Sequence, residues 1–204
     1  MHLAQKARNV WRGLLQTRGT ENVKRSLWNK EFTGGRWISL DNTPGDCVYA
    51  YVEKYARNGS ILDLGCGSGN TGNELEAKTY RHYTGVDISD VAIEKARRRT
   101  EENRRADKNS YFQSDILSYA PTQQYDVILL REVIFYVPRA KIRSVLNRYS
   151  EYLKEGGVFI VRICNIAGKY KIFVDTIESN FLVVEKYVAD QTTTAVIVFR
   201  QRPS

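Results

Sequence analysis

The sequence is poor in the residues that build disulfide frameworks and metal centres. Its 204 residues include only two histidines and three cysteines, Cys47, Cys66 and Cys164. An odd number of widely spaced cysteines fits neither a disulfide framework nor a zinc-ligand pattern. We therefore expect reduced thiols and no bound metal.

Long hydrophobic runs are also missing. No apolar run approaches the roughly 20 residues that a membrane-spanning helix needs. Residues 1–25 contain basic side chains but no continuous apolar stretch of the kind found in a secretory signal. The sequence therefore predicts a cytoplasmic protein without a membrane partner.

Acidic residues are outnumbered, with 23 Asp and Glu against 31 Lys and Arg, for a net charge of +8. A positive balance attracts anions and raises the possibility of a nucleic-acid partner. One basic stretch is the N-terminal segment, with Lys6, Arg8, Arg12, Arg18, Lys24 and Arg25. The other, residues 95–105, is interleaved with glutamates at helical spacing. That spacing favours an ion-paired, solvent-exposed helix face for the second stretch.

Helical and strand patterns alternate from about residue 44 onward, which is typical of βαβ units with a parallel sheet. The expected helices cover residues 44–58, 71–77, 91–103 and 138–153. The expected strands cover 61–64, 82–87, 111–117, 125–133 and 158–164, with a final hairpin in 181–200 that turns around 190–192. We predict one α/β domain at residues 44–204, a doubly wound, mostly parallel sheet of seven strands with an antiparallel last strand and helices on both faces.

Residues 1–43 differ in composition from the rest of the chain. Val10, Trp11, Leu14 and Leu15 suit a short amphipathic helix, and the stretch WNKEFTGGRW at 28–37 places large aromatic rings around a Gly-Gly pair. This combination fits either a mobile helical and aromatic cover over a pocket or a segment that packs permanently on the core. The sequence leaves both interpretations open.

The stretch ILDLGCGSGN at residues 61–70 has three glycines directly after a short apolar run. A glycine turn between a buried strand and a helix brings bare backbone and a helix N-terminus next to a ligand. Asp87 ends the next expected strand about 20 residues later, where a carboxylate can accept both hydrogen bonds of a ribose diol. The spacing is G-x-G-x-G, and neither the dinucleotide G-x-G-x-x-G nor a Walker-type G-K-S/T occurs. The pattern indicates an adenosine site without defining the cofactor.

Five motifs in chain order resemble those of the class I S-adenosylmethionine-dependent methyltransferases. ILDLGCGSG resembles their first motif, VDIS their second-strand acidic motif, and SDIL the segment beside adenine. YDVILLREVIFYVP resembles their fourth strand and its loop, and LKEGGVFIVRI their fifth strand. The resemblance covers about residues 44–200. It implies a Rossmann-like fold with S-adenosyl-L-methionine as cofactor and S-adenosyl-L-homocysteine as product.

The resemblance also implies roles for individual residues. Asp63 would lie near the methionine amino group, Asp87 would hold the ribose hydroxyls, and Asp115 would accept a hydrogen bond from the adenine amino group. A strand-end cap or a solvated surface group is the alternative role for each acid. The full set implied for cofactor binding is Trp37, Asp63, Gly65, Cys66, Gly67, Gly69, Asp87, Ile88, Ser114, Asp115, Ile116 and Arg131, the last through its main chain.

The acceptor side is less defined. Neither histidine is a good base candidate, because His2 is terminal and His82 lies at the start of the second strand, on the side of the sheet away from the glycine loop. Glu132 and Tyr136 lie where relatives of this kind place substrate-facing groups, and we predict them as catalytic, with an ion pair and core packing as the respective alternatives. The predicted substrate-side residues are Trp28, Phe32, Phe135, Arg162, Asn165, Lys169 and Tyr170. Arg162 and Lys169 would suit an anionic acceptor.

The motifs that mark several nucleic-acid methyltransferases are missing. There is no N-P-P-Y or D-P-P-Y stretch, and no Pro-Cys dipeptide. We therefore expect an S-adenosylmethionine-dependent methyltransferase that acts on an oxygen or nitrogen atom of a small molecule or peptide. Two alternatives stay open, an RNA methyltransferase guided by the basic N-terminus and a non-catalytic cofactor-binding protein.

Overall fold

The computed structural model describes residues 2–37, 43–166, 168, 170–189 and 193–203. It contains a seven-stranded sheet with the order β3-β2-β1-β4-β5-β7-β6. The strands are β1 (Ser60–Leu64), β2 (His82–Asp87), β3 (Asn109–Gln113), β4 (Tyr125–Arg131), β5 (Leu153–Ile163), β6 (Leu182–Ala189) and β7 (Thr194–Arg200). Strands β1 to β5 pair in parallel, and β7 lies antiparallel between β5 and β6. The predicted sheet, with its antiparallel last strand, is confirmed.

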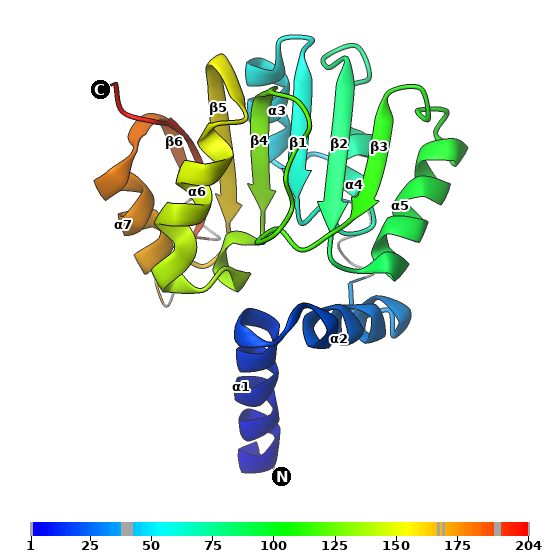
Figure 1. Ribbon diagram of the computed structural model, residues 1–204, viewed down its shortest axis with the longest axis vertical. Helices are drawn as coiled ribbons and strands as arrows, with labels where there is room; N and C mark the ends of the chain where they lie inside the picture. The colour runs from blue at the N-terminus through cyan, green and yellow to red at the C-terminus, as the bar shows by residue number, and fades with distance from the viewer. Residues whose placement is uncertain (1, 38–42, 167, 169, 190–192, 204) are drawn as a thin grey trace.

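Helices cover both faces of this sheet (Figure 1). Their bounds are α3 (Val48–Ala56), α4 (Asn70–Glu74), α5 (Asp90–Glu102), α6 (Ile142–Ser150) and α7 (Lys171–Asn180), with 3-10 turns η2 (Ile134–Tyr136) and η3 (Arg139–Lys141). Alternate strand residues enter two separate cores because successive side chains point to opposite faces. In β4, Ile128 packs in the core under α6 and α7, whereas Val127 packs in the core with α3 and α5.

Several predicted boundaries were wrong. The strand expected at 111–117 runs from Asn109 to Gln113, and the helix expected at 71–77 ends at Glu74. The helix expected to extend to residue 153 ends at Ser150, because Leu153 is already the first residue of β5 and pairs with Tyr125 of β4. Helix α7 was not predicted. These errors share one cause, since pairing with a neighbouring strand or packing on the sheet sets these ends and local propensity does not.

The N-terminal segment forms two helices, α1 (His2–Arg18) and α2 (Glu21–Thr33). Thr20 caps α2 through its side-chain oxygen, which accepts from the Val23 amide. Figure 1 shows α2 lying across the carboxyl ends of the strands and α1 projecting away from the sheet. The aromatic stretch at 28–37 is helical up to Thr33. Residues 38–42 lie outside the described part of the chain, so the proposed boundary at residue 43 stays a prediction.

No helix in the described part of the chain is long and apolar enough to cross a membrane.

Candidate cofactor and acceptor site

A cavity of about 610 Å³ lies between the carboxyl ends of the strands and helix α2. Its wall includes Gly65 and Gly67, and their loop follows β1 as the sequence predicts. Gly65, Gly67 and Gly69 all have positive φ, at 79°, 55° and 74°. A Cβ atom at Gly65 would collide with Val133, and one at Gly69 would lie 2.7 Å from the Ala96 Cβ. Glycine is therefore required for both the turn and the close packing behind it.

Asp87, the last residue of β2, holds the glycine loop in place through a hydrogen bond. Its carboxylate accepts hydrogen bonds from the Gly67 amide at 3.0 Å and from the Ser89 amide at 2.9 Å. Burial raises the pKa of Asp87 to about 6, against the opposing effect of these backbone donors. The carboxyl group is thus placed at the cavity wall and keeps acceptor capacity for further hydroxyl donors.

Asp63, near the end of β1, is almost completely buried at the cavity wall. Its Oδ2 accepts from the Tyr83 hydroxyl, while its Oδ1 has no hydrogen-bond partner among the described residues. Burial raises the pKa of Asp63 to about 6. A buried carboxylate oxygen without a donor is costly, and an ammonium group in the cavity would supply one.

Asp115 lies at the other end of the cavity, after β3. Its Oδ1 accepts from the Leu117 amide at 3.0 Å, and its Oδ2 accepts from the Lys24 ammonium of helix α2. Both side chains of this ion pair are 8% exposed. Ile88 and Ile116 line the same end of the cavity. A planar apolar ring with a polar edge would fit between these groups.

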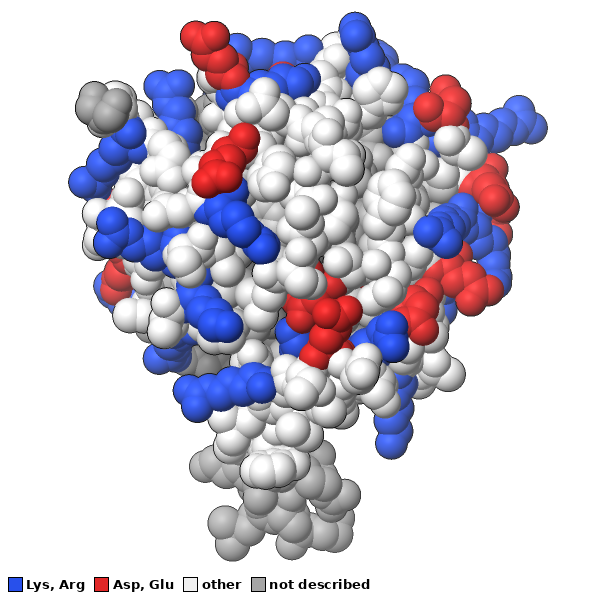
Figure 2. Space-filling view, in the orientation of Figure 1, with Lys and Arg blue, Asp and Glu red and all other residues white. Residues whose placement is uncertain are grey.

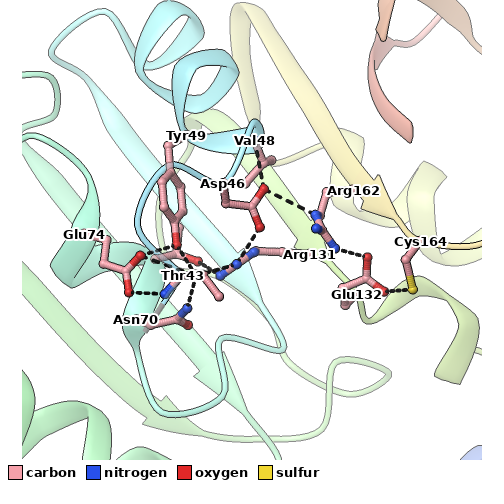
Figure 3. A network of polar contacts seen from close by, with 11 residues as sticks. Thr43, Asp46, Val48, Tyr49, Asn70, Glu74, Arg131, Glu132, Arg162 and Cys164 are labelled. Carbon is pink, nitrogen blue, oxygen red and sulfur yellow. Dashed lines mark hydrogen bonds and ion pairs between the residues drawn. The ribbon is translucent and has the colours of Figure 1, made fainter. Parts of the chain in front are cut away.

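Another part of the cavity wall is formed by charged side chains that are linked to one another by ion pairs and hydrogen bonds (Figure 3). Asp46 accepts from Arg131 at 2.7 Å and from Arg162 at 3.3 Å. Arg162 also donates to Glu132 at 2.5 Å, and the Cys164 thiol donates to the second Glu132 oxygen at 3.0 Å. Burial, together with the contact to Glu132, raises the pKa of Cys164 to about 11, so the thiol is protonated at neutral pH.

Aromatic side chains close the remaining side. Trp28 of α2 packs edge-on against Tyr136 with centroids 4.8 Å apart, and Phe135 stacks on Tyr170 at 4.5 Å. Burial raises the pKa of the Tyr136 hydroxyl well above its usual range, so it stays protonated at neutral pH. Trp37 lies 5.9 Å from Trp28. This wall joins the N-terminal helix to the loop after β4.

Most of the predicted site residues line this one cavity. They are Trp28, Phe32, Trp37, Asp63, Gly65, Cys66, Gly67, Asp87, Ile88, Asp115, Ile116, Arg131, Glu132, Phe135, Tyr136, Arg162 and Tyr170. Gly69, Ser114 and Asn165 are not among the lining residues. Lys169 lies outside the described residues. Glu132 and Tyr136 also show the features of their alternative roles. Glu132 forms an ion pair, and Tyr136 is packed among aromatic rings.

The sequence reasoning missed several lining residues, among them Lys24, Thr43 and Asp46. Arg131 was expected to act through its main chain, but its side chain bonds Asp46 and Thr43, each at 2.7 Å. The turn residues Pro44 and Gly45 mark only a change of direction before α3. Nothing local in the sequence indicates that Thr43 or Asp46 faces a pocket.

The donor and acceptor set fits S-adenosylmethionine. Among the described lining residues, five carboxylates face three basic side chains, so the cavity favours a ligand with a net positive charge. The orphaned oxygen of Asp63 suits the ammonium, and the carboxylate of Asp87 suits a ribose diol. The adenine end is apolar between Ile88 and Ile116.

Comparison with known proteins gives the same family. A family profile described as a methyltransferase domain matches residues 62–159, from β1 into β5. An mRNA cap guanine-N(7) methyltransferase of Cryptococcus neoformans var. neoformans serotype D is 29% identical over 126 residues, covering 54% of this chain and 20% of that protein. A sterol 24-C-methyltransferase of Gibberella zeae is 28% identical over 100 residues, covering 48% of this chain and 26% of that protein. The chain thus spans about a fifth to a quarter of the length of these relatives.

Solved structures share the fold. The N-methyltransferase NodS from Bradyrhizobium japonicum WM9, in complex with S-adenosyl-L-homocysteine, superposes with a TM-score of 0.68 at 18% identity, covering 88% of this chain and 98% of that one. The profile match supports the predicted methyltransferase family over residues 62–159, and the solved structure supports the predicted fold. Residues 62–159 therefore match the methyltransferase-domain family, within a fold that the chain shares with a known N-methyltransferase.

Proposed function

We propose that the protein transfers the methyl group of S-adenosylmethionine to an oxygen or nitrogen atom of a small-molecule or peptide acceptor. The observation that carries this proposal is the shared cavity. The glycine loop, Asp63 and Asp87 line one part of it, and Glu132, Tyr136 and Tyr170 line another. A cofactor and a compact acceptor can therefore lie in one cavity, as an in-line displacement requires.

The cofactor supplies a methyl group already activated by its sulfonium, so the protein mainly positions the two reactants. Asp63 and Asp87 hold the cofactor, and α2 excludes water from the cavity. Glu132 accepts a hydrogen bond from the acceptor, since its carboxylate oxygens have lone pairs beyond those used by Arg162 and Cys164. The protonated Tyr136 hydroxyl serves as a hydrogen-bond donor and not as a base.

The charges of the acceptor wall favour a neutral acceptor. Arg162, which was expected to attract an anion, is already paired with Asp46 and Glu132. The aromatic rings of Trp28, Phe135 and Tyr170 add flat apolar surface. We expect an acceptor with a planar or apolar body and one hydroxyl or amino group.

An RNA acceptor is the second candidate, and the cap methyltransferase similarity favours it. Figure 2 shows basic side chains scattered among acidic and uncharged ones on the visible face of the described residues. In α5, Arg98 pairs with Glu94 at 3.7 Å, as expected for a solvated face. RNA binding driven by basic residues would weaken steeply with salt.

Two measurements test the proposal. Calorimetric titration with S-adenosyl-L-homocysteine should show binding to the wild type and a loss of about 1–3 kcal/mol in Asp87→Ala, because charged hydrogen bonds to the ribose are removed. Asp175→Ala, which removes an exposed ion pair with Lys171 on α7, is the matched control and should bind normally. Unchanged affinity in a folded Asp87→Ala variant would reject the assignment.

Turnover of labelled S-adenosylmethionine is then measured against small metabolites, peptides and RNA. Methylation of small molecules or peptides, with weak salt dependence, is the expected result. Methylation of RNA with steep salt dependence would favour the second candidate. Cofactor binding without transfer to any acceptor would favour a non-catalytic binding protein.

A further inference from the structure

Arg131 and Arg162 are neighbours across two parallel strands. They pair in register at the carboxyl ends of β4 and β5, so their side chains leave the same face of the sheet. Both line the cavity, and their exposed fractions are only 11% and 21%. Two like charges held side by side with little water repel each other unless an anion lies between them.

Asp46 is the anion between these arginines. One oxygen accepts from Arg131 Nη2 at 2.7 Å, and the other accepts from Arg162 Nε at 3.3 Å. The Asp46 side chain is 5% exposed. Burial tends to raise the pKa of Asp46, but Arg131, Arg162 and the Val48 amide outweigh it and lower the pKa. The carboxylate is therefore charged at neutral pH.

The position of Asp46 is fixed by the backbone of helix α3. The Val48 amide donates to Asp46 Oδ1 at 3.1 Å, and the Tyr49 amide donates to the Asp46 carbonyl at 3.0 Å. The Asp46 amide in turn donates to the Thr43 carbonyl at 3.2 Å. The carboxylate thus has a rigid support that belongs to neither β4 nor β5.

Arg162 links Asp46 to Glu132 on the acceptor side of the cavity. It donates to Glu132 through Nη1 at 2.5 Å, while its Nε is held by Asp46 (Figure 3). Glu132 has a left-handed backbone with φ of 56°, an unfavourable conformation for a residue other than glycine. Its side chain is held at the cavity wall by two donors, Arg162 and Cys164.

We infer that Asp46 is a positioning residue for methyl transfer, which aligns Arg131 on the cofactor side and, through Arg162, Glu132 on the acceptor side. The inference rests on the proposed function, and it names a residue outside the recognised motifs. Asp46 lies at the cavity wall, but both of its carboxylate oxygens are engaged, by Arg131 on one and by Arg162 and the Val48 amide on the other. It acts through the two arginines, so that one carboxylate sets the geometry of both halves of the cavity.

The test uses Asp46→Asn, which keeps the shape of the side chain and removes its charge. One readout is the alkylation rate of each cysteine by iodoacetamide at pH 8.5, measured by peptide mass spectrometry. Without its anchor, Arg162 moves and draws Glu132 away from Cys164, so the thiol ionises more easily. Cys164 should be alkylated about threefold faster or more. Buried Cys66 should stay unreactive, which excludes general unfolding.

The second readout is affinity for S-adenosyl-L-homocysteine without any acceptor. It should fall about tenfold in Asp46→Asn, because Arg131 loses a charged hydrogen bond beside the cofactor. Asp126→Asn is the matched control, since Asp126 also accepts from a backbone amide, of Ser60, and from a basic side chain, of Lys154. It should change neither readout.

Arg162→Lys separates the two halves of the inference and replaces Asp46→Asn if that variant does not fold. It should speed alkylation of Cys164 and leave cofactor affinity within about twofold, because Arg131 keeps its partner. Unchanged alkylation of Cys164 in folded Asp46→Asn, or unchanged affinity there, would overturn the inference. Failure of the wild type to bind S-adenosyl-L-homocysteine would reject the proposed function instead, and the alkylation result would still show whether Asp46 governs Glu132.

Discussion

Lys24 in helix α2 donates to the carboxylate of Asp115, a residue 91 positions later in the chain. Each side chain is 8% exposed, so the pair is almost fully removed from water. Asp115 lies at the end of the cavity where the family resemblance places adenine. The N-terminal segment is therefore fastened to the cofactor end of the site by a buried ion pair, in addition to the aromatic contact between Trp28 and Tyr136.

If α2 is a mobile cover, this ion pair is the contact that must break when the cavity opens. We predict that amide exchange in residues 21–37 is faster than in α5 in the free protein, and that S-adenosyl-L-homocysteine slows it. Lys24→Met should speed exchange in α2 roughly tenfold, because a buried charged hydrogen bond is lost. Hydrogen exchange with mass spectrometry measures each effect.

Lys30→Met is the control for this experiment, because Lys30 is an exposed residue of the same helix. It should leave exchange in α2 unchanged. Exchange in residues 28–37 that is already as slow as in α5 without ligand would show that the segment is a fixed part of the core.

Gly69 and Gly156 offer a matched pair for the glycine loop. Both have φ of 74°. A Cβ at Gly69 would lie 2.7 Å from the Ala96 Cβ and 3.0 Å from the Tyr111 ring, whereas a Cβ at Gly156 meets nothing within 4 Å. Gly156→Ala should therefore cost about 1–2 kcal/mol of backbone strain, and Gly69→Ala should cost about 1–3 kcal/mol more from overpacking.

The free energies of unfolding in urea test this difference, and titration with S-adenosyl-L-homocysteine tests its effect on the site. Gly69→Ala should weaken cofactor binding and Gly156→Ala should not. Equal losses of stability in the two variants would mean that the packing behind the loop adapts to a methyl group.

The pKa of Asp63 predicts how cofactor binding depends on pH. Burial raises this pKa to about 6, so the carboxyl group is partly protonated in the free protein below that pH. A cofactor ammonium favours the charged form, so binding should release a proton and strengthen as the pH rises from about 5 to about 7. Calorimetry in buffers of different ionisation enthalpy measures the released proton. Affinity that falls over this range would contradict the assignment of Asp63.

The raised pKa of Asp63 also affects the stability of the fold. Cofactor binding should strengthen as the pH rises, whereas the stability of the fold should fall. A carboxyl group whose pKa is raised in the folded state destabilises the fold as the pH rises from the unfolded value, 3.8, through the folded value, about 6. The Asp63→Asn variant has no carboxyl group at this position, so it does not show this loss of stability. Its free energy of unfolding relative to the wild type should therefore rise by roughly 3 kcal/mol at most between pH 4 and pH 7. A relative stability that does not change with pH would show that Asp63 titrates normally.

The sequence by itself determined the sheet, the glycine loop and the acid at the end of β2. These features are local, because a buried strand needs a short apolar run and a left-handed turn needs glycine. Asp63 and Asp87 could be placed at the cavity for the same reason, since parallel strands bring their carboxyl ends to one edge of the sheet. The order of the motifs along the chain then indicated the family.

Only the tertiary structure decided what faces these residues. The end of the helix at Ser150 depends on the pairing of Leu153 with Tyr125, and helix propensity carries no information about that partner. Lys24 meets Asp115 because α2 crosses the strand ends, and Asp46 meets Arg131 and Arg162 because α3 begins beside β4 and β5. Such contacts join side chains far apart in the chain, and they leave no periodic pattern because ion pairing depends on distance in space and not on spacing in sequence.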